Sequence, residues 1–320
     1  MSVARGRALG LLAGLGADAV LGDPPNRWHP TAWFGTWAGW LVRRCSADSV
    51  PAGVGYVVAA VAPVTLVGVG VEALGRRWPW LRPGCTALAT WAVVGAHSLA
   101  HEGRTMAGRL EAGDLPGARD QLSHLCGRQA AGLDEPELAR ATIESLAENT
   151  ADSVVASVFW GALLGAPGLL THRAVNTLDA MVGHRSERYE RFGKCAARLD
   201  DALDLLPARA TGLLAGLVSP RPIQTWRVTI RDARNHPSPN GGWCEAAWAA
   251  ALGVALGGTN VYPGGRVEDR GVLNPGGRPP DGVAVRRASR MVTAVTTLAG
   301  AGAGAGAAAA LLVFGARRRR

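Results

Sequence analysis

The chain has 320 residues, of which 48% are hydrophobic and 18% are charged, and its formal net charge is +9. The charged share is below the quarter or so that is usual in soluble domains. Because the basic residues are scattered without an aromatic-interleaved patch, we expect no nucleic-acid partner. Five widely spaced cysteines, none in a C-x-x-C pair, indicate neither a disulfide framework nor a zinc site.

The first distinctive segment spans residues 22–45 and reads "GDPPNRWHPTAWFGTWAGWLVRRC". A proline-rich turn is followed by four tryptophans, namely Trp28, Trp33, Trp37 and Trp40. Tryptophan is enriched where a membrane meets water. We therefore expect this stretch to lie at the surface of a lipid membrane.

Apolar runs indicate the fold class. A helix that crosses a membrane needs about 20 apolar residues, and residues 54–74, 154–170 and 291–314 meet this requirement. Shorter runs at 84–99 and 244–256 are compatible with short spans, re-entrant segments or buried helices. We predict an all-α, multi-pass helical integral membrane protein with about four to six spans.

The polar segments form loops within one membrane-embedded domain that covers residues 1–320. These loops lie at about 102–149, 173–204, 219–243 and 258–290. Four arginines follow the last apolar run, and such clusters favour the cytoplasmic side. We predict that the protein lies in the cell membrane with its active site on the cytoplasmic side, and no feature indicates an oligomeric state.

Glu144, Glu148 and Asp152 are spaced at i, i+4 and i+8, so they share one face of a helix. Like charges at this spacing repel each other. One interpretation is a solvated helix start in which Arg140 pairs with Glu144. The other is a Mg²⁺ site in which Asn149 adds a carbonyl oxygen. The adjoining apolar run favours the second interpretation, because acids near lipid tend to mark functional sites.

A second acidic group follows in the loop at 173–204. It contains Asn176, Asp179, Asp200, Asp201 and Asp204. Basic residues are interleaved with it, so a surface helix stabilised by ion pairs is one interpretation. The D-D-x-x-D spacing is also found in the diphosphate-binding motif of membrane prenyltransferases, although so short a motif is a weak signal.

The sequence "HPSPNGG" predicts a turn immediately before a helix that starts near Trp243. Turn amides and helix N-termini attract anions. Ser238 and Asn240 could therefore hold a phosphate, with Arg231 nearby. The alternative is an ordinary Asn-Gly turn between two helices.

Several long stretches carry a resemblance to a known family. They are "GDPPNRWHPTAWFG", "AGLDEPELARATIESLAENTADSVVA", "AVNTLDAMVGHRSERYERFGKCAARLDD", "LPAR" and "RDARNHPSPNGGWCEAAWAAALGVALGG". In this order they resemble the CobD/CbiB family of adenosylcobinamide-phosphate synthases. The resemblance implies a cobalamin-biosynthesis ligase in the membrane. It would join (R)-1-amino-2-propanol, or its O-phosphate, to the propionate of adenosylcobyric acid, with ATP as co-substrate and Mg²⁺.

The resemblance locates the motifs, and we assign the roles within them. The predicted catalytic residues are Glu144, Glu148, Asn149 and Asp179. The predicted substrate- and phosphate-binding residues are Arg231, Asp232, His236, Ser238 and Asn240. The predicted metal ligands are Glu148, Asp152, Asp200 and Asp201. Three positions depart from the family pattern, since Gln129, Ser157 and Asp204 stand where it has Asp, Pro and Asn.

Two alternatives of other classes stay open at this point. A membrane prenyltransferase would hold Mg²⁺-diphosphate on two groups of residues, which are Asp200, Asp201 and Asp204, and Asn176 and Asp179. A transporter would place its acids near the middle of the bilayer, whereas the acids in this chain lie at the ends of apolar segments.

Overall fold

The computed structural model describes residues 2–45, 47–184, 188–262, 265 and 267–317, so most of the terminal arginine cluster lies outside the described residues. The chain divides into two compact units. Unit 1 comprises residues 1–95, 156–204 and 298–320, and unit 2 comprises residues 96–155 and 205–297. Each unit is thus assembled from separate stretches of chain. The single domain expected from the sequence stays a prediction.

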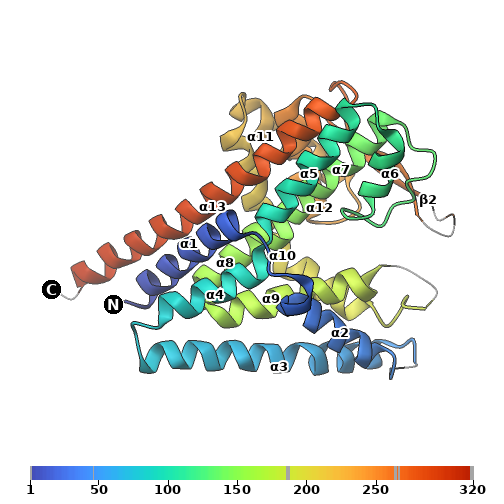
Figure 1. Cartoon of the computed structure of the whole chain (residues 1–320). Coiled ribbons are helices and arrows are strands. Elements are labelled where there is room, and N and C mark those ends of the chain that lie inside the picture. Colours follow the sequence, from blue (N-terminus) through green and yellow to red (C-terminus); the bar gives the residue numbers. More distant parts are fainter. Residues whose placement is uncertain (1, 46, 185–187, 263–264, 266, 318–320) are drawn as a thin grey trace. The chain divides into compact units, whose positions relative to one another are not determined.

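The secondary-structure elements in the described residues of unit 1 are all helical (Figure 1). Its elements are α1 (Val3–Leu21), the 3₁₀ turn Asn26–Trp28, α2 (Pro30–Val42), α3 (Val50–Arg77), α4 (Arg82–Val94), α8 (Ala156–Leu164), α9 (Ala166–Leu178), the π-helical turn Asp179–Gly183, the first part of α10 (Lys194–Val218) and the last part of α13 (Gly282–Arg317).

Small residues allow the helices of unit 1 to pack closely. α1 lies against α4, and a Cβ added at Gly14 would stand 2.6 Å from the carbonyl oxygen of Ala87. α3 lies along α9, and a Cβ at Gly68 would stand 2.7 Å from the α-carbon of Pro167. Close helix contacts through glycine are typical of membrane helix pairs.

Two of the described helices, α3 and the Gly282–Ala309 part of α13, are long and apolar enough to cross a membrane. The long helices predicted at 54–74 and 291–314 are therefore confirmed. The single helix predicted at 154–170 is wrong, because the chain breaks at Gly165, where φ is +74°, and α9 restarts there. Pro167 in the first turn of α9 favours this restart, since proline needs no helical amide partner there.

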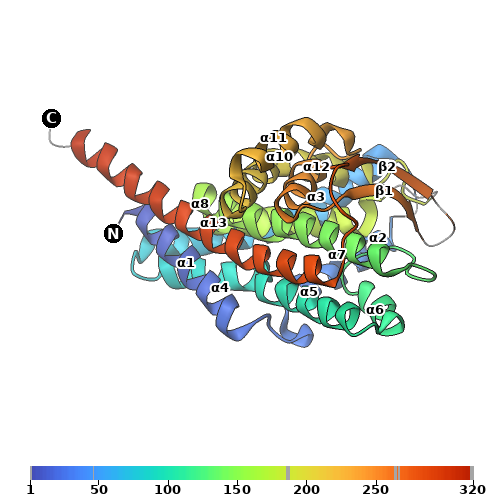
Figure 2. The same ribbon diagram turned by 90° about the horizontal axis from the view of Figure 1, so that it is seen from above.

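Unit 2 combines helices with one β-hairpin (Figure 2). Its elements are α5 (Ala96–Glu111), α6 (Leu115–Leu122), α7 (Glu135–Asn149), the π-helical turn Thr150–Val155, the second part of α10, α11 (Pro222–Asp232), the 3₁₀ turn Ala233–Asn235, α12 (Gly241–Leu252), β1 (Leu256–Val261), β2 (Val267–Leu273) and the first part of α13. α7 packs against α5, α6 and α12. α7 therefore lies centrally in this unit.

The hairpin corrects the prediction of a purely helical chain with a loop at 258–290. Leu256–Val261 and Val267–Leu273 pair antiparallel, and α13 begins already at Gly282. Arg140 on α7 donates to the carbonyl oxygens of Gly257 (2.5 Å) and Thr259 (2.9 Å). The first strand is thus fixed by contacts from a distant helix, which no local pattern in the sequence encodes.

Candidate active site

Glu144 occupies the buried side of α7, where its side chain is fully shielded from solvent. Its Oε2 lies 2.5 Å from a guanidinium nitrogen of Arg128, and its Oε1 lies 3.8 Å from Arg140. Oε1 also accepts a hydrogen bond from the amide of Gly257 at 2.7 Å. A buried carboxylate is stable only when paired and hydrogen-bonded in this way. The predicted pairing of Glu144 with Arg140 is therefore present, with Arg128 as a second and closer partner.

The surroundings of Glu144 keep it ionised. Burial raises the pKa of this carboxyl, but Arg128, Arg140 and the Gly257 amide outweigh burial, so that its pKa is lowered. Gly257 adopts φ +84°, a backbone region that suits glycine. Glu144 thus links α7 to β1. Its catalytic role stays a prediction, and its contacts are those of a residue that stabilises the fold.

Glu148 lies one turn further along α7 and is 34% exposed. Its Oε1 is 3.9 Å from the guanidinium of Arg270 on β2. A Cβ added at Gly241 would stand 2.9 Å from the same oxygen. Glycine at position 241 therefore allows the carboxylate to approach the start of α12, and Glu148 is the partly open acid of this site.

His236 and Glu245 form the buried side of the same site. The Nδ1 of His236 accepts the amide hydrogen of Ser238 at 3.1 Å. That Nε2 faces Oε1 of Glu245 at 3.3 Å. Burial raises the pKa of Glu245 to about 8, and the charges of Glu144 and Glu148 add to this effect. Burial lowers the pKa of His236, but its contact with Glu245 outweighs burial and raises it.

Arg270 connects these acids. Its guanidinium lies 2.9 Å from Nε2 of His236 and 3.3 Å from Oε1 of Glu245. On its other side, it donates to Glu268 at 3.3 Å and to the hydroxyl of Tyr262 at 3.2 Å. We call the group formed by Arg128, Arg140, Glu144, Glu148, His236, Glu245 and Arg270 the arginine–carboxylate centre. It can present a positive charge and a partly open carboxylate to one ligand.

The turn at residues 236–241 uses several of its amides internally. Ser238 Oγ accepts hydrogen bonds from the amides of Asn240 and Gly241, both at 3.2 Å. This bonding starts α12 at Gly241, close to the predicted position. The predicted phosphate role of Ser238 and Asn240 would therefore rely on groups other than these two amides.

Arg231 and Asp232 pair with each other at the end of α11. The Arg231 guanidinium donates to both carboxylate oxygens of Asp232, at 2.5 and 2.7 Å, and is 60% exposed. This bond lowers the pKa of Asp232. Asp232 also accepts the amide hydrogen of Asn274 at 2.8 Å. The pair thus anchors the segment after β2, and its phosphate-binding role stays a prediction.

Asn149 and Asp152 lie where α7 passes into the π-helical turn. The Nδ2 of Asn149 donates to the carbonyl oxygen and the hydroxyl of Ser145, at 2.9 and 3.1 Å. Burial raises the pKa of the Cys244 thiol, and the charges of Glu148 and Asp152 raise it further. Both acids therefore lie near the start of α12. Single π-helical turns are often found at functional sites.

Unit 1 contains a second polar group, which we call the aspartate–histidine centre. His172 on α9 and Asp204 on α10 are both buried, and Nε2 of His172 lies 2.7 Å from Oδ1 of Asp204. Asp200 lies one turn earlier on α10, and the three side chains offer ligand atoms within 4.8 Å of one another. Histidine and carboxylates at this spacing are able to hold a divalent cation.

The charge balance of this second centre favours a cation. Burial raises the pKa of Asp200 to about 9, and Asp204 and Asp179 raise it further. Burial also raises the pKa of Asp201, with Asp204 adding to it. Oδ1 of Asp200 is buried without a hydrogen-bond partner. The predicted metal ligands Asp200 and Asp201 and the predicted catalytic residue Asp179 therefore lie in one acidic environment.

Sequence reasoning missed the partners that complete both centres. Arg128, Glu245 and Arg270 were not singled out, because each reaches the site from an element distant in sequence. His172 lies beside Arg173 in an otherwise largely apolar segment, "GLLTHRAV". An ionisable residue in such a segment is itself a signal of a site, and this signal could have found it.

Comparison with known proteins identifies the family. The chain matches the CobD/Cbib protein family over residues 11–292. It is 45% identical to the cobalamin biosynthesis protein CobD of Mycobacterium tuberculosis over 299 residues, which cover 90% of this chain and 93% of that protein.

Two further relatives give the same result. Identity is 40% with CobD of Rhodobacter capsulatus, covering 90% of this chain and 96% of that protein. Identity is 37% with the cobalamin biosynthesis protein CbiB of Salmonella typhimurium, covering 88% of this chain and 92% of that protein. No solved structure matches the chain. The chain therefore belongs to the CobD/CbiB family of cobalamin biosynthesis proteins.

Proposed function

We propose that this protein catalyses ATP-dependent amide formation between adenosylcobyric acid and (R)-1-amino-2-propanol or its O-phosphate. The product would be adenosylcobinamide or its phosphate. The observation that carries this proposal is the arginine–carboxylate centre, in which Arg270 faces the partly open Glu148. Membership of a cobalamin biosynthesis family favours this reaction over the prenyltransferase and transporter alternatives.

The reaction requires activation of a carboxylate, which is a poor acyl donor. Transfer of the γ-phosphoryl group of ATP to the propionate would form an acyl phosphate and release ADP. The amine would then attack the acyl carbon, form the amide and expel phosphate. In this scheme, the arginine–carboxylate centre binds and orients anionic groups through Arg270. Glu148 would accept the proton that the substrate's ammonium group must lose before the neutral amine attacks.

Mg²⁺ would neutralise phosphate charge in this reaction. The residues of the aspartate–histidine centre fit such an ion, because an unpartnered buried oxygen of Asp200 lies among carboxylates that raise its pKa. Asp200 and Asp201 would hold it, together with Asp204 and His172. Glu148 is a further candidate ligand, because Glu148, His236 and Glu245 also offer ligand atoms within 4.8 Å of one another, and Asp152 stays a predicted ligand.

The test uses the purified full-length protein in detergent with adenosylcobyric acid, ATP and Mg²⁺. One reaction contains aminopropanol and another contains its O-phosphate. Mass spectrometry should detect the corresponding amide, and equimolar ADP should accumulate. Absence of amide with both amines, in a preparation that unfolds cooperatively on heating, would refute the proposal.

A further inference from the structure

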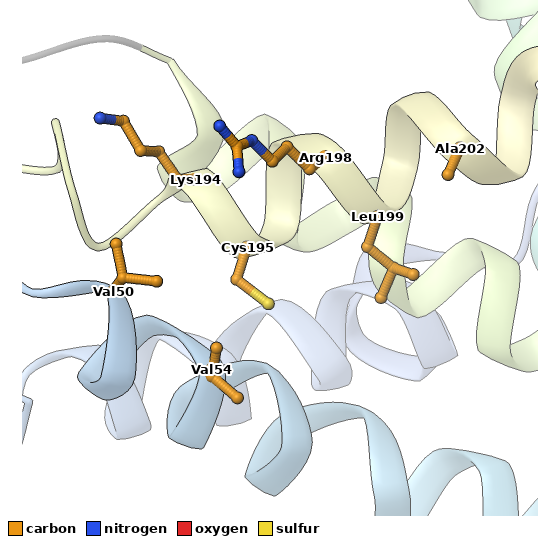
Figure 3. A pocket seen from close by; sticks show the side chains of 7 residues that line it. All are labelled: Val50, Val54, Lys194, Cys195, Arg198, Leu199 and Ala202. Atoms are coloured by element: carbon orange, nitrogen blue, oxygen red, sulfur yellow. The ribbon is translucent and has the colours of Figure 1, made fainter.

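A groove in unit 1 lies apart from both polar centres. It is formed by the first turns of α3 and the start of α10, and its volume is about 370 Å³. Its lining residues are Val50, Val54, Lys194, Cys195, Arg198, Leu199 and Ala202 (Figure 3). Five of these seven side chains are apolar or weakly polar, and the other two are cationic.

The groove has an apolar floor that solvent can reach. Val50 and Val54 are a helical turn apart on α3 and are 45% and 43% exposed. Leu199 on α10 is 37% exposed. Figure 3 shows Cys195 and Val54 facing each other across the groove. Exposed apolar surface of this kind usually marks contact with a partner or with lipid.

The cationic residues lie on one side of this floor. Lys194 and Arg198 are one turn apart on α10, and their charged ends extend from the outer side of the groove (Figure 3). Their alkyl stems line it, as expected when long basic side chains cover apolar surface and keep their charge in water. Within the described residues, Lys194 forms an ion pair with the half-exposed Glu190 at 3.9 Å, whereas Arg198 forms none.

The position of the groove indicates its ligand. Val50 is the first residue of α3, one of the two helices able to cross a membrane. The first turn of a spanning helix lies near the level of the lipid headgroups. The apolar floor would then match the acyl chain of a lipid, and the cationic rim formed by Lys194 and Arg198 would match its charged headgroup. Basic clusters beside a membrane-spanning helix attract anionic lipid.

We propose that this groove binds one anionic phospholipid. An acyl chain lies on Val50, Val54 and Leu199, and the phosphate contacts Lys194 and Arg198. This site does not depend on the proposed reaction, because its residues belong to neither polar centre. Binding can therefore be tested without measuring activity.

The test uses the full-length protein in detergent and measures alkylation of Cys195 by peptide mass spectrometry, with Cys85 as an internal reference. Phosphatidylglycerol should slow alkylation of Cys195 in a saturable manner. Phosphatidylcholine should act only at much higher concentration, and inorganic phosphate should have no effect. Equal protection by both lipids, or protection by inorganic phosphate alone, would overturn the proposal.

Variants test the two halves of the groove separately. Arg198→Ala should weaken protection by phosphatidylglycerol about fivefold, the equivalent of about 1 kcal/mol per basic residue near a lipid surface. Arg77→Ala, at the other end of α3, removes the same charge and should change nothing. Ala202→Phe fills the floor without altering charge and should weaken protection by either lipid. If Arg198→Ala and Arg77→Ala behave alike while both fold normally, the assignment of the phosphate to this rim is wrong.

Discussion

At the scale of single residues, Glu148 and Glu144 have different environments although they are one turn apart. Glu144 is fully buried between two arginines, whereas Glu148 is 34% exposed and faces Arg270. The sequence predicted that both would lie on one face of a helix. It could not predict which would remain accessible, because Arg128 and Arg270 approach from other parts of the chain.

We expect Glu148→Gln to lower the rate of amide formation at least 100-fold, because a positioned general base contributes about 10²–10⁴-fold. The fold should persist, since the substitution removes a charge from a partly exposed site. The measurement is kcat by mass spectrometry together with thermal unfolding. Glu137→Gln is the matched control on the same helix, because glutamine also completes the capping box there. Near-normal kcat for Glu148→Gln would remove this residue from the mechanism.

The raised pKa of Glu245 makes stability depend on pH. The folded protein keeps a proton on this carboxyl up to about pH 8, whereas the unfolded chain loses it near 4.5. This contribution is therefore complete below 4.5 and is lost as the pH rises towards 8, at up to about 1.4 kcal/mol per pH unit. Relative to Glu245→Gln, the wild type should lose thermal stability between pH 5 and 8. Parallel curves for the two proteins would contradict the raised pKa.

At the scale of elements, apolar runs predicted α3 and most of α13, because an uninterrupted apolar stretch leaves few structures other than a long helix. The break at Gly165 and the hairpin at 256–273 were not predicted. A positive φ and contacts from α7 decide these features, and neither follows from composition. The hairpin matters most, since it carries Arg270 to the site.

The link between α7 and the hairpin should contribute to the stability of the fold. Arg128→Met leaves Glu144 buried with only Arg140 and the Gly257 amide as partners. We expect a loss of about 3 kcal/mol, the low end for breaking a buried pair. The double variant Arg128→Met/Glu144→Leu should regain part of this stability, because the buried carboxylate is removed, while Arg140 keeps the carbonyl oxygens of Gly257 and Thr259 as acceptors and the Gly257 amide loses its acceptor. The measurement is thermal unfolding of both variants. If the double variant is no more stable than Arg128→Met, the unpaired carboxylate of Glu144 is not the cause of the lost stability.

At the scale of the whole molecule, the arginine–carboxylate centre belongs to unit 2 and the aspartate–histidine centre to unit 1. The predicted orientation places the polar loops on the cytoplasmic side of the membrane. Cys126 and Cys195, one in each unit, should then react with an impermeant maleimide only after the cytoplasmic face is made accessible. Burial raises the pKa of both thiols, so labelling should be performed at alkaline pH. Labelling of both from the outer face of intact cells would reverse the orientation.

The central claim is that the propionate is activated by phosphoryl transfer before the amine attacks. The most direct measurement uses adenosylcobyric acid with ¹⁸O in the reacting carboxylate, together with ATP, Mg²⁺ and the amine. We expect the formation of each amide to transfer one ¹⁸O atom to inorganic phosphate, with ADP as the other product. Recovery of the label in AMP, or in water with unlabelled phosphate, would contradict it.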